Sequence, residues 1–146
     1  VTQKAIDLSQ LLNVDPVLAT VFPNTTLGNQ LKQVAKLIKF NQGSPAPLSR
    51  QIYFCSLGGF DTHQGQVTNQ SNLLTQVGNA MKAFYDATVE LNLAQDVTTF
   101  TLSDFGRTFQ PAGSGSGVVG SDHAWGNHHF VMGGSPTRPR TPSVPK

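Results

Sequence analysis

The stretch from residue 51 to residue 103 decides the expected fold: it opens with QIYFCSL (residues 51–57) and closes with VTTFTLS (residues 97–103). Both runs are short and rich in β-branched and aromatic residues, which is typical of buried strands. Between them, apolar residues recur at helical spacing over residues 70–93, which predicts a long helix. A strand, a helix and a second strand in this order predict a βαβ unit with parallel strands. We therefore expect an α/β fold with a mostly parallel sheet.

Three further segments complete the expected organisation. Apolar residues three and four positions apart predict a helix over residues 27–40, capped by one of the two threonines before it. The run HHFVM (residues 128–132) predicts a third strand, and GSGSG (residues 113–117) predicts a flexible loop. Residues 135–146 are rich in proline and basic residues, so we expect a disordered tail after a folded part at residues 1–134.

The composition excludes several classes of protein. At 146 residues the chain is of single-domain size, and 38% hydrophobic with 12% charged residues is unlike a disordered acidic chain or a coiled coil. The net charge of +2 is too small to indicate a nucleic-acid partner. No apolar run approaches the ~20 residues of a membrane helix, so we expect no membrane partner. The one cysteine, Cys55, lies in an apolar run and is expected to be an unreactive thiol.

All four histidines fall in motifs rich in glycine and aspartate. The first motif, GGFDTH, follows the first expected strand and contains Asp61 and His63; the second, SDFGR, ends the second strand and contains Asp104. Because the carboxyl ends of parallel strands share one edge of a sheet, these three side chains are expected to lie together. Carboxylates and imidazoles that meet in this way are suited to holding a pair of divalent metal ions.

The third motif has the strongest composition for metal binding. GSDHAWGNHH contains Asp122, His123, His128 and His129 within eight positions. Imidazole with carboxylate suits zinc first, with manganese or iron as alternatives, and the lack of further cysteines argues against a structural zinc finger. His128 and His129 point to opposite faces of a regular strand, so we expect one of them to be a ligand.

Each motif also has a simpler interpretation. Asp61 can be a turn residue beside a surface His63, Asp104 can cap a turn, and Asp122 can cap a helix. Taken singly, these interpretations compete well with metal binding. Taken together they require three separate motifs to resemble ligand sets by coincidence, so we favour the metal site. Arg107 is expected to bind an anionic substrate group, or else to form a surface salt bridge.

These motifs, together with FVMGG after the last histidines, resemble those of the domain-of-unknown-function 1501 (DUF1501) family, from about residue 27 to residue 134. That family is similar to the alkaline phosphatase and sulfatase superfamily. The resemblance implies an alkaline-phosphatase-like sandwich, two divalent metals, and export to the periplasm or cell surface. It also implies that this chain is a carboxy-terminal part, because the amino-terminal half that supplies the superfamily's nucleophile is missing and the chain begins with Val1.

By position, the resemblance assigns Asp61 and His63 to one metal. Asp104, or else Asp122 with His123, is assigned to the other. A late lone ligand corresponds to His128 or His129. The chain departs from the family pattern where aspartate stands for glutamate at position 104 and alanine for glycine at position 124.

The leading functional hypothesis is a metal-dependent hydrolase of small anionic phosphate, sulfate or related esters. The catalytic set would be Asp61, His63, Asp104 and His123, with Arg107 holding the anionic group. One alternative is a metal-binding or scaffolding protein without activity, which forms a homo-oligomer or pairs with the missing half. Another is a metal-independent serine esterase that uses one of three serines, at positions 56, 103 and 121.

Overall fold

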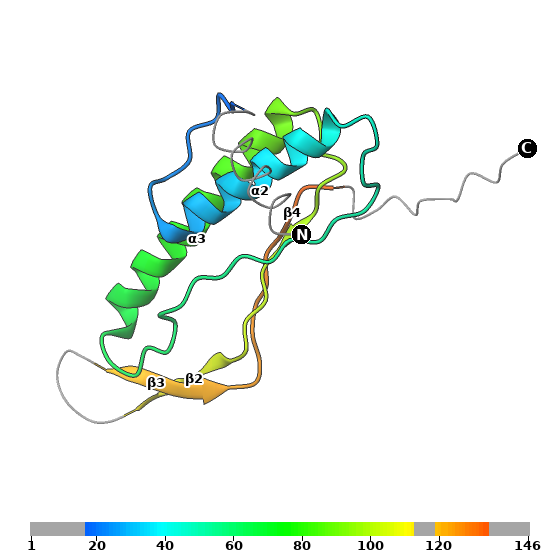
Figure 1. Ribbon diagram of the computed structural model, residues 1–146. Helices are drawn as coiled ribbons and strands as arrows, with labels where there is room; N and C mark the ends of the chain where they lie inside the picture. Colours follow the sequence, from blue (N-terminus) through cyan, green and yellow to red (C-terminus); the bar gives the residue numbers. More distant parts are fainter. Residues whose placement is uncertain (1–16, 113–118, 135–146) are drawn as a thin grey trace, which may run out of the picture.

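The computed structural model describes residues 17–112 and 119–134, and these residues form two helices and two small sheets (Figure 1). The shorter helix packs against the second half of the longer helix at one end of the molecule, and the longer helix begins beside the longer strand pair at the other end. None of the described helices is long and apolar enough to cross a membrane. In chain order the elements are α2 (Thr26–Gln42), α3 (Gln66–Glu90), β1 (Thr99–Phe100), β2 (Gly106–Ala112), β3 (Gly120–Ala124) and β4 (Val131–Met132).

The sequence predicted α2 correctly. Its N-cap is Thr25, whose hydroxyl oxygen accepts a hydrogen bond from the backbone N–H of Gly28 at 3.1 Å. This bond satisfies one of the free N–H groups of the first helical turn. The spacing of apolar residues places Leu27, Leu31 and Ala35 on one buried face, as predicted.

The long helix α3 was also predicted, although it begins and ends a few residues earlier than expected. Gly65 precedes it in the left-handed region, with φ of 57°, and no side chain caps this end. Glycine adopts this conformation without steric cost, which lets the chain turn sharply into the helix. The buried residues belong to the second half of α3 and include Ala80, Phe84 and Ala87.

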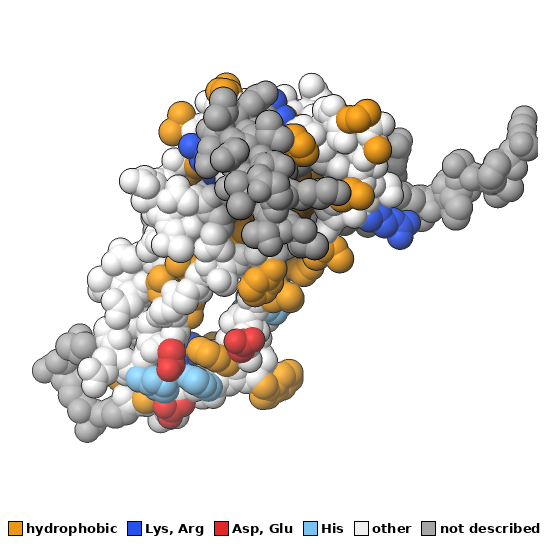
Figure 2. All heavy atoms as spheres, viewed as in Figure 1, with side chains coloured by type: hydrophobic (Ala, Val, Ile, Leu, Met, Phe, Trp, Pro, Cys, Tyr) orange, Lys and Arg blue, Asp and Glu red, His pale blue; other side chains and the backbone are white. Residues whose placement is uncertain are grey.

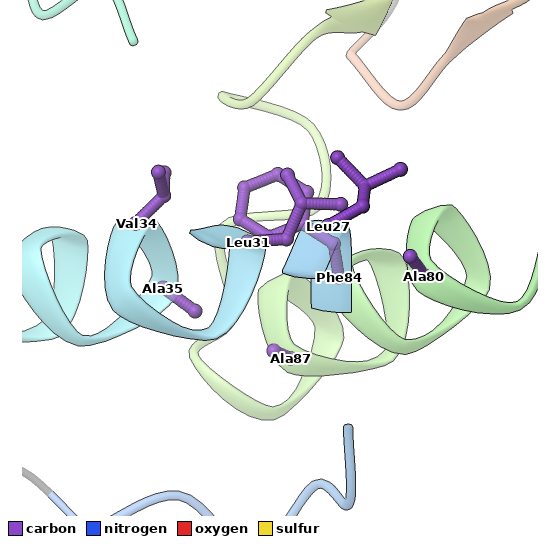
Figure 3. Close-up of a cluster of buried hydrophobic side chains, with 7 residues drawn as sticks. All are labelled: Leu27, Leu31, Val34, Ala35, Ala80, Phe84 and Ala87. Atoms are coloured by element: carbon purple, nitrogen blue, oxygen red, sulfur yellow. The ribbon is translucent and has the colours of Figure 1, made fainter. Parts of the chain in front are cut away.

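The apolar core lies between the two helices (Figure 3). Small alanines on both helices allow close approach, and the larger side chains of Leu31 and Phe84 fill the space between them. Burying a side chain of this size stabilises a protein by about 1.5–3 kcal/mol. The buried cluster consists of Leu27, Leu31, Val34, Ala35, Ala80, Phe84 and Ala87.

Both sheets consist of two antiparallel strands. In the first, β1 pairs with β4, so that Phe100 lies opposite Val131. In the second, β2 and β3 form a hairpin whose register places Arg107 opposite His123 and Pro111 opposite Ser121, with an irregularity between these pairs. Proline lacks a backbone N–H, so strand pairing is commonly irregular near it.

The predicted parallel sheet and alkaline-phosphatase-like sandwich are wrong for this structure. Residues 51–57 are not part of any sheet; the side chain of Gln30 both donates to and accepts from the backbone of Ser56. The second expected strand, residues 97–103, pairs only over β1, and its partner β4 is antiparallel. The reason is physical: a run of β-forming residues indicates an extended backbone, but strand pairing depends on distant residues. The expected loop at 113–117 and tail at 135–146 lie outside the described residues.

Candidate metal centre

Three predicted ligands meet at the end of the molecule that carries the β2–β3 hairpin. Asp61 and His63 come from the segment that precedes α3, and His123 comes from β3. The Asp61 Oδ1 atom lies 2.8 Å from Nε2 of His63 and 2.7 Å from Nε2 of His123. One ligand atom of each residue lies within 4.8 Å of the others. Figure 2 shows histidine side chains gathered with acidic ones at this end.

A buried threonine shapes the segment that carries the first two ligands. Thr62 is 4% exposed, while Asp61 and His63 on either side of it are exposed. Its hydroxyl oxygen accepts a hydrogen bond from Nε2 of Gln70 in α3 at 3.1 Å. Gly120 of β3 lies so close that a Cβ there would collide with the backbone of Thr62 and His63. The absence of a side chain at Gly120 therefore permits β3 to approach the ligand segment.

Ring stacking orients the third ligand. The ring of His123 lies parallel to that of Phe105, with 3.9 Å between centroids and 3° between planes. The His63 ring also stacks on the His123 ring, with 5.2 Å between centroids and 24° between planes. Stacking restricts rotation of the His123 ring, so that its Nε2 is directed to Asp61.

Arg107 is the most enclosed charged side chain of the site, at 10% exposed. Its Nη1 donates to the carbonyl oxygen of Ser121 at 2.7 Å. Its Nη2 donates to the carbonyl oxygen of Phe60, to Oδ1 of Asp61 and to Oγ1 of Thr62, at 3.2, 3.4 and 3.3 Å. Its Nε is buried without a hydrogen-bond partner among the described residues.

These neighbours favour the ionised form of Asp61. The hydrogen bond from His123 is the main cause that lowers the pKa of the Asp61 carboxyl; desolvation opposes it, and electrostatic interactions with His63, His123 and Arg107 lower the pKa further. The Asp61 side chain is 60% exposed, so water screens these interactions. A carboxylate that is negative at neutral pH and open to solvent is well suited to bind a cation.

A family model described as "Protein of unknown function (DUF1501)" matches residues 49–140, which is more than half of the 146-residue chain. The chain belongs to the DUF1501 family. The match includes Asp61, His63 and His123 as well as Arg107, and it begins after α2. Neither the curated proteins nor the solved structures contain a match to this chain.

Within this DUF1501 site, Asp122 lies beside a ligand rather than among the ligands. Its Oδ1 is 3.6 Å from Nδ1 of His63, while the other ring nitrogen of His63 faces Asp61. Histidine ligands commonly have such a carboxylate on the nitrogen that faces away from the metal, where it fixes the orientation of the ring. The geometry therefore favours Asp122 beside the His63 ring over the direct metal contact that the sequence predicted.

The structure does not bring the other three predicted ligands of this DUF1501 chain to the cluster. Asp104, His128 and His129 are exposed. They do not belong to the group of side chains whose ligand atoms lie within 4.8 Å of one another. His128 and His129 precede β4, whose partner is β1 rather than the hairpin that carries His123. Their assignment as ligands remains a prediction, for which the geometry offers no support.

The donor set fits a single divalent cation. Two imidazoles and one carboxylate match zinc, iron or manganese, and three protein ligands leave coordination positions open for water or substrate. Metal–ligand distances of about 2.0–2.1 Å separate neighbouring donors by roughly 3 Å, so small movements of these exposed side chains would admit the ion. The predicted metal pair would need more ligands than the described residues bring together.

Sequence reasoning missed the residues that support this DUF1501 site. Phe105 lies inside the SDFGR motif that singled out its neighbours, but its stacking on His123 depends on a hairpin that was not predicted. Thr62 stands between two predicted ligands, and this position was the one available indication of its importance. The role of Gly120 becomes apparent only from its distance to a segment far away in sequence.

Proposed function

We propose that this DUF1501 chain is a metal-dependent hydrolase of phosphate, sulfate or related esters. The observation that carries the proposal is the convergence of Asp61, His63 and His123 on a space open to solvent. We propose zinc as the first candidate metal, because imidazole and carboxylate are its usual ligands where a catalytic site keeps open positions.

The chemistry divides between the cation and the chain. A bound divalent cation would polarise the ester oxygen and lower the pKa of a bound water. Asp61 supplies the negative charge that balances the cation, and His63 and His123 supply neutral imidazole nitrogens. The three side chains are about half exposed, so an anionic ester can reach the site from solvent. Oδ1 of Asp122 lies 3.6 Å from the outer nitrogen of His63, where a small movement would bring it to hydrogen-bond distance.

The substrate class rests on the resemblance of the family's motifs to the alkaline phosphatase and sulfatase superfamily. Kinship with that superfamily, placement as a carboxy-terminal part, and export are components of this proposal. Arg107 was predicted to hold the anionic group, but both of its terminal nitrogens already donate to protein oxygens. We therefore propose that the bound cation recognises the anionic group and that Arg107 supports the segments that carry the ligands.

The test combines metal analysis with hydrolysis of a panel of aryl phosphates, sulfates and carboxylate esters. The chain purified without chelator should contain about one zinc, iron or manganese per molecule and lose its activity in chelator. Asp61→Asn should abolish both binding and activity because it removes the ligand's negative charge. Asp104→Asn is the matched control and should change neither. A protein that binds none of these metals, or hydrolyses the esters equally well in chelator, would disprove the proposal.

A second candidate function is metal binding without catalysis, in a chain that pairs with another protein surface. Among the described residues, five large hydrophobic side chains are 86–106% exposed: Val21, Ile52, Phe54, Phe109 and Trp125. Ile52 and Phe54 are two positions apart in one segment, while Phe109 and Trp125 lie on or next to the β2–β3 hairpin. Exposed apolar residues that gather in one patch are typical of surfaces that contact a partner. Stoichiometric metal with no hydrolysis of any ester, together with a dimer in sedimentation equilibrium, would favour this candidate.

The serine esterase alternative has weaker support. The hydroxyl of Ser121 donates to Oε1 of Gln66, and that of Ser103 donates to the carbonyl oxygen of Phe105. Neither contact is with a histidine that could act as a base. Activity that survives chelation would nevertheless select this alternative over the metal-dependent one.

A further inference from the structure

The ligands of the proposed metal site belong to two segments far apart in the sequence. Asp61 and His63 precede α3, whereas His123 lies in β3, 62 residues after Asp61. A cation bound by all three therefore requires these two segments to be held at a fixed separation. We propose that Arg107 is the positioning residue that holds them, an inference that rests on the metal-dependent function proposed above.

The hydrogen bonds of Arg107 connect the two segments directly. Nη1 donates to the carbonyl oxygen of Ser121, two residues before His123, at 2.7 Å. Nη2 donates to the carbonyl oxygen of Phe60 and to the hydroxyl of Thr62, the residues on either side of Asp61, at 3.2 and 3.3 Å. One guanidinium therefore bridges the backbone of β3 and the backbone of the segment that carries Asp61.

The same side chain also contacts ligands or their neighbours. Nη2 lies 3.4 Å from Oδ1 of Asp61, the atom that faces both histidines. The guanidinium carbon lies 5.4 Å from the centre of the Phe105 ring, and that ring stacks on His123. Arg107 thus acts on Asp61 by a charge-assisted contact and on His123 through an aromatic ring.

The chemistry of the side chain explains why arginine suits this role. Its planar group presents donors in fixed directions, so two nitrogens can bind acceptors on different segments at once. A lysine has one ammonium on a flexible chain and cannot reproduce this bridge. The side chain is 10% exposed, which favours a positioning role over contact with a substrate in solvent.

The experiment measures Co²⁺ binding by the full chain, because Co²⁺ replaces zinc and its visible spectrum reports the geometry of its ligands. Partners outside the ligand set typically change metal affinity by about 10–100-fold. Arg107→Lys should weaken Co²⁺ binding within this range and alter the visible spectrum. The matched control, Arg50→Lys, replaces an exposed arginine on a loop and should change neither. A helical circular dichroism spectrum equal to that of the wild type would show that both variants are folded.

The outcomes separate the two proposals. A wild-type chain that does not bind Co²⁺ disproves the metal site itself. The positioning role alone is disproved if the wild-type chain binds Co²⁺ and Arg107→Lys binds it with an affinity within twofold of the wild type and an unchanged visible spectrum. If Arg107→Lys does not fold, Thr62→Val decides against Gln70→Leu as its control: both remove the bond between Gln70 and Thr62, and only Thr62→Val also removes an acceptor of Arg107. We expect about a threefold loss of affinity for Thr62→Val, and unchanged affinity would overturn the inference.

Discussion

The helix pair and the end of the molecule that carries the candidate metal centre are held together by different interactions. Every buried hydrophobic side chain of the described residues lies in residues 27–35 or 80–91, on or next to the two helices. Near the ligands, the buried side chains are polar: Thr62 and Ser121 both form hydrogen bonds there. Apolar burial therefore stabilises one end, and directional polar contacts arrange the other. Mutations should then divide by location into those that change stability and those that change the site.

The largest effect should come from the helix pair. Phe84→Ala removes a ring that is 4% exposed and leaves a cavity between α2 and α3. We expect the free energy of unfolding to fall by about 3–5 kcal/mol, which urea denaturation followed by circular dichroism would measure.

Phe109→Ala is the matched control, because it makes the same chemical change on β2, where the ring is fully exposed. It should change the unfolding free energy by less than about 0.5 kcal/mol. Equal effects of the two substitutions would contradict the proposed division, since they would place a second apolar core at the hairpin.

The next largest effect should come from the metal centre and should leave stability of the metal-free protein nearly unchanged. His123→Ala removes one of three proposed ligands, so zinc affinity measured by calorimetry should fall about 100-fold or more, equivalent to about 2.8 kcal/mol. His129→Ala removes an imidazole that the structure places outside the cluster. The His129→Ala variant should bind zinc with an affinity within twofold of that of the wild type. A large loss of affinity would instead support His129 as a ligand.

The same division explains what the sequence could predict of the fold. Both helices were predicted because an apolar stripe is a local pattern, and α2 also has a capping threonine. Leu31 and Phe84 are each buried on the face that their spacing indicates. The sheets were predicted poorly because pairing is not local. Residues 51–57 have the composition of a buried strand, yet Ile52 within them is 99% exposed. Strand β2 begins at Gly106 and Arg107, which belong to the SDFGR motif and were not predicted to form a strand.

The site was predicted in part, for a related reason. Residue chemistry alone singled out Asp61, His63 and His123, which the structure brings together. It also singled out Asp104, which has the same chemistry but lies outside the group. Composition cannot distinguish these cases, because the difference lies in which strand pairs with which. The expected parallel edge would have placed Asp104 beside Asp61, and the antiparallel hairpin places Arg107 there instead.

A smaller effect should come from the start of α2. Thr25→Ala removes the hydrogen bond to the backbone N–H of Gly28, so stability should fall by about 1 kcal/mol. Ser103→Ala is its counterpart near the hairpin, where the hydroxyl bonds only a neighbouring exposed carbonyl. That substitution should cost less than about 0.5 kcal/mol in the same urea experiment. A larger cost at Ser103 than at Thr25 would show that local polar contacts matter more at the hairpin than at the helix.

The smallest effect should be a pH dependence at the far end of α3. The Glu90 carboxylate accepts hydrogen bonds from the backbone N–H groups of Ala19 and Thr20 and from the Thr20 hydroxyl, at 3.0, 2.9 and 2.7 Å. The bond from Ala19 is the main cause that lowers the pKa of Glu90 in the folded state. The folded protein therefore favours the ionised form of Glu90 more than the unfolded chain does. The resulting stability is present at pH values above the ordinary glutamate pKa of about 4.5.

That contribution is lost as the pH falls through the lowered pKa of the folded state. Glu90 is exposed, so we expect Glu90→Gln to cost only about 0.2–1 kcal/mol at pH 7, and progressively less below about pH 4.5. Urea denaturation of both proteins at pH 7, 5.5, 4 and 3 would measure the difference. A difference that stays constant down to pH 3 would mean that the carboxylate charge is not what holds residues 19–20 against α3. The contact between residues 19–20 and α3 would then depend on interactions other than the charge of Glu90, and the contrast between the helix pair and the polar contacts around Arg107 would be sharper.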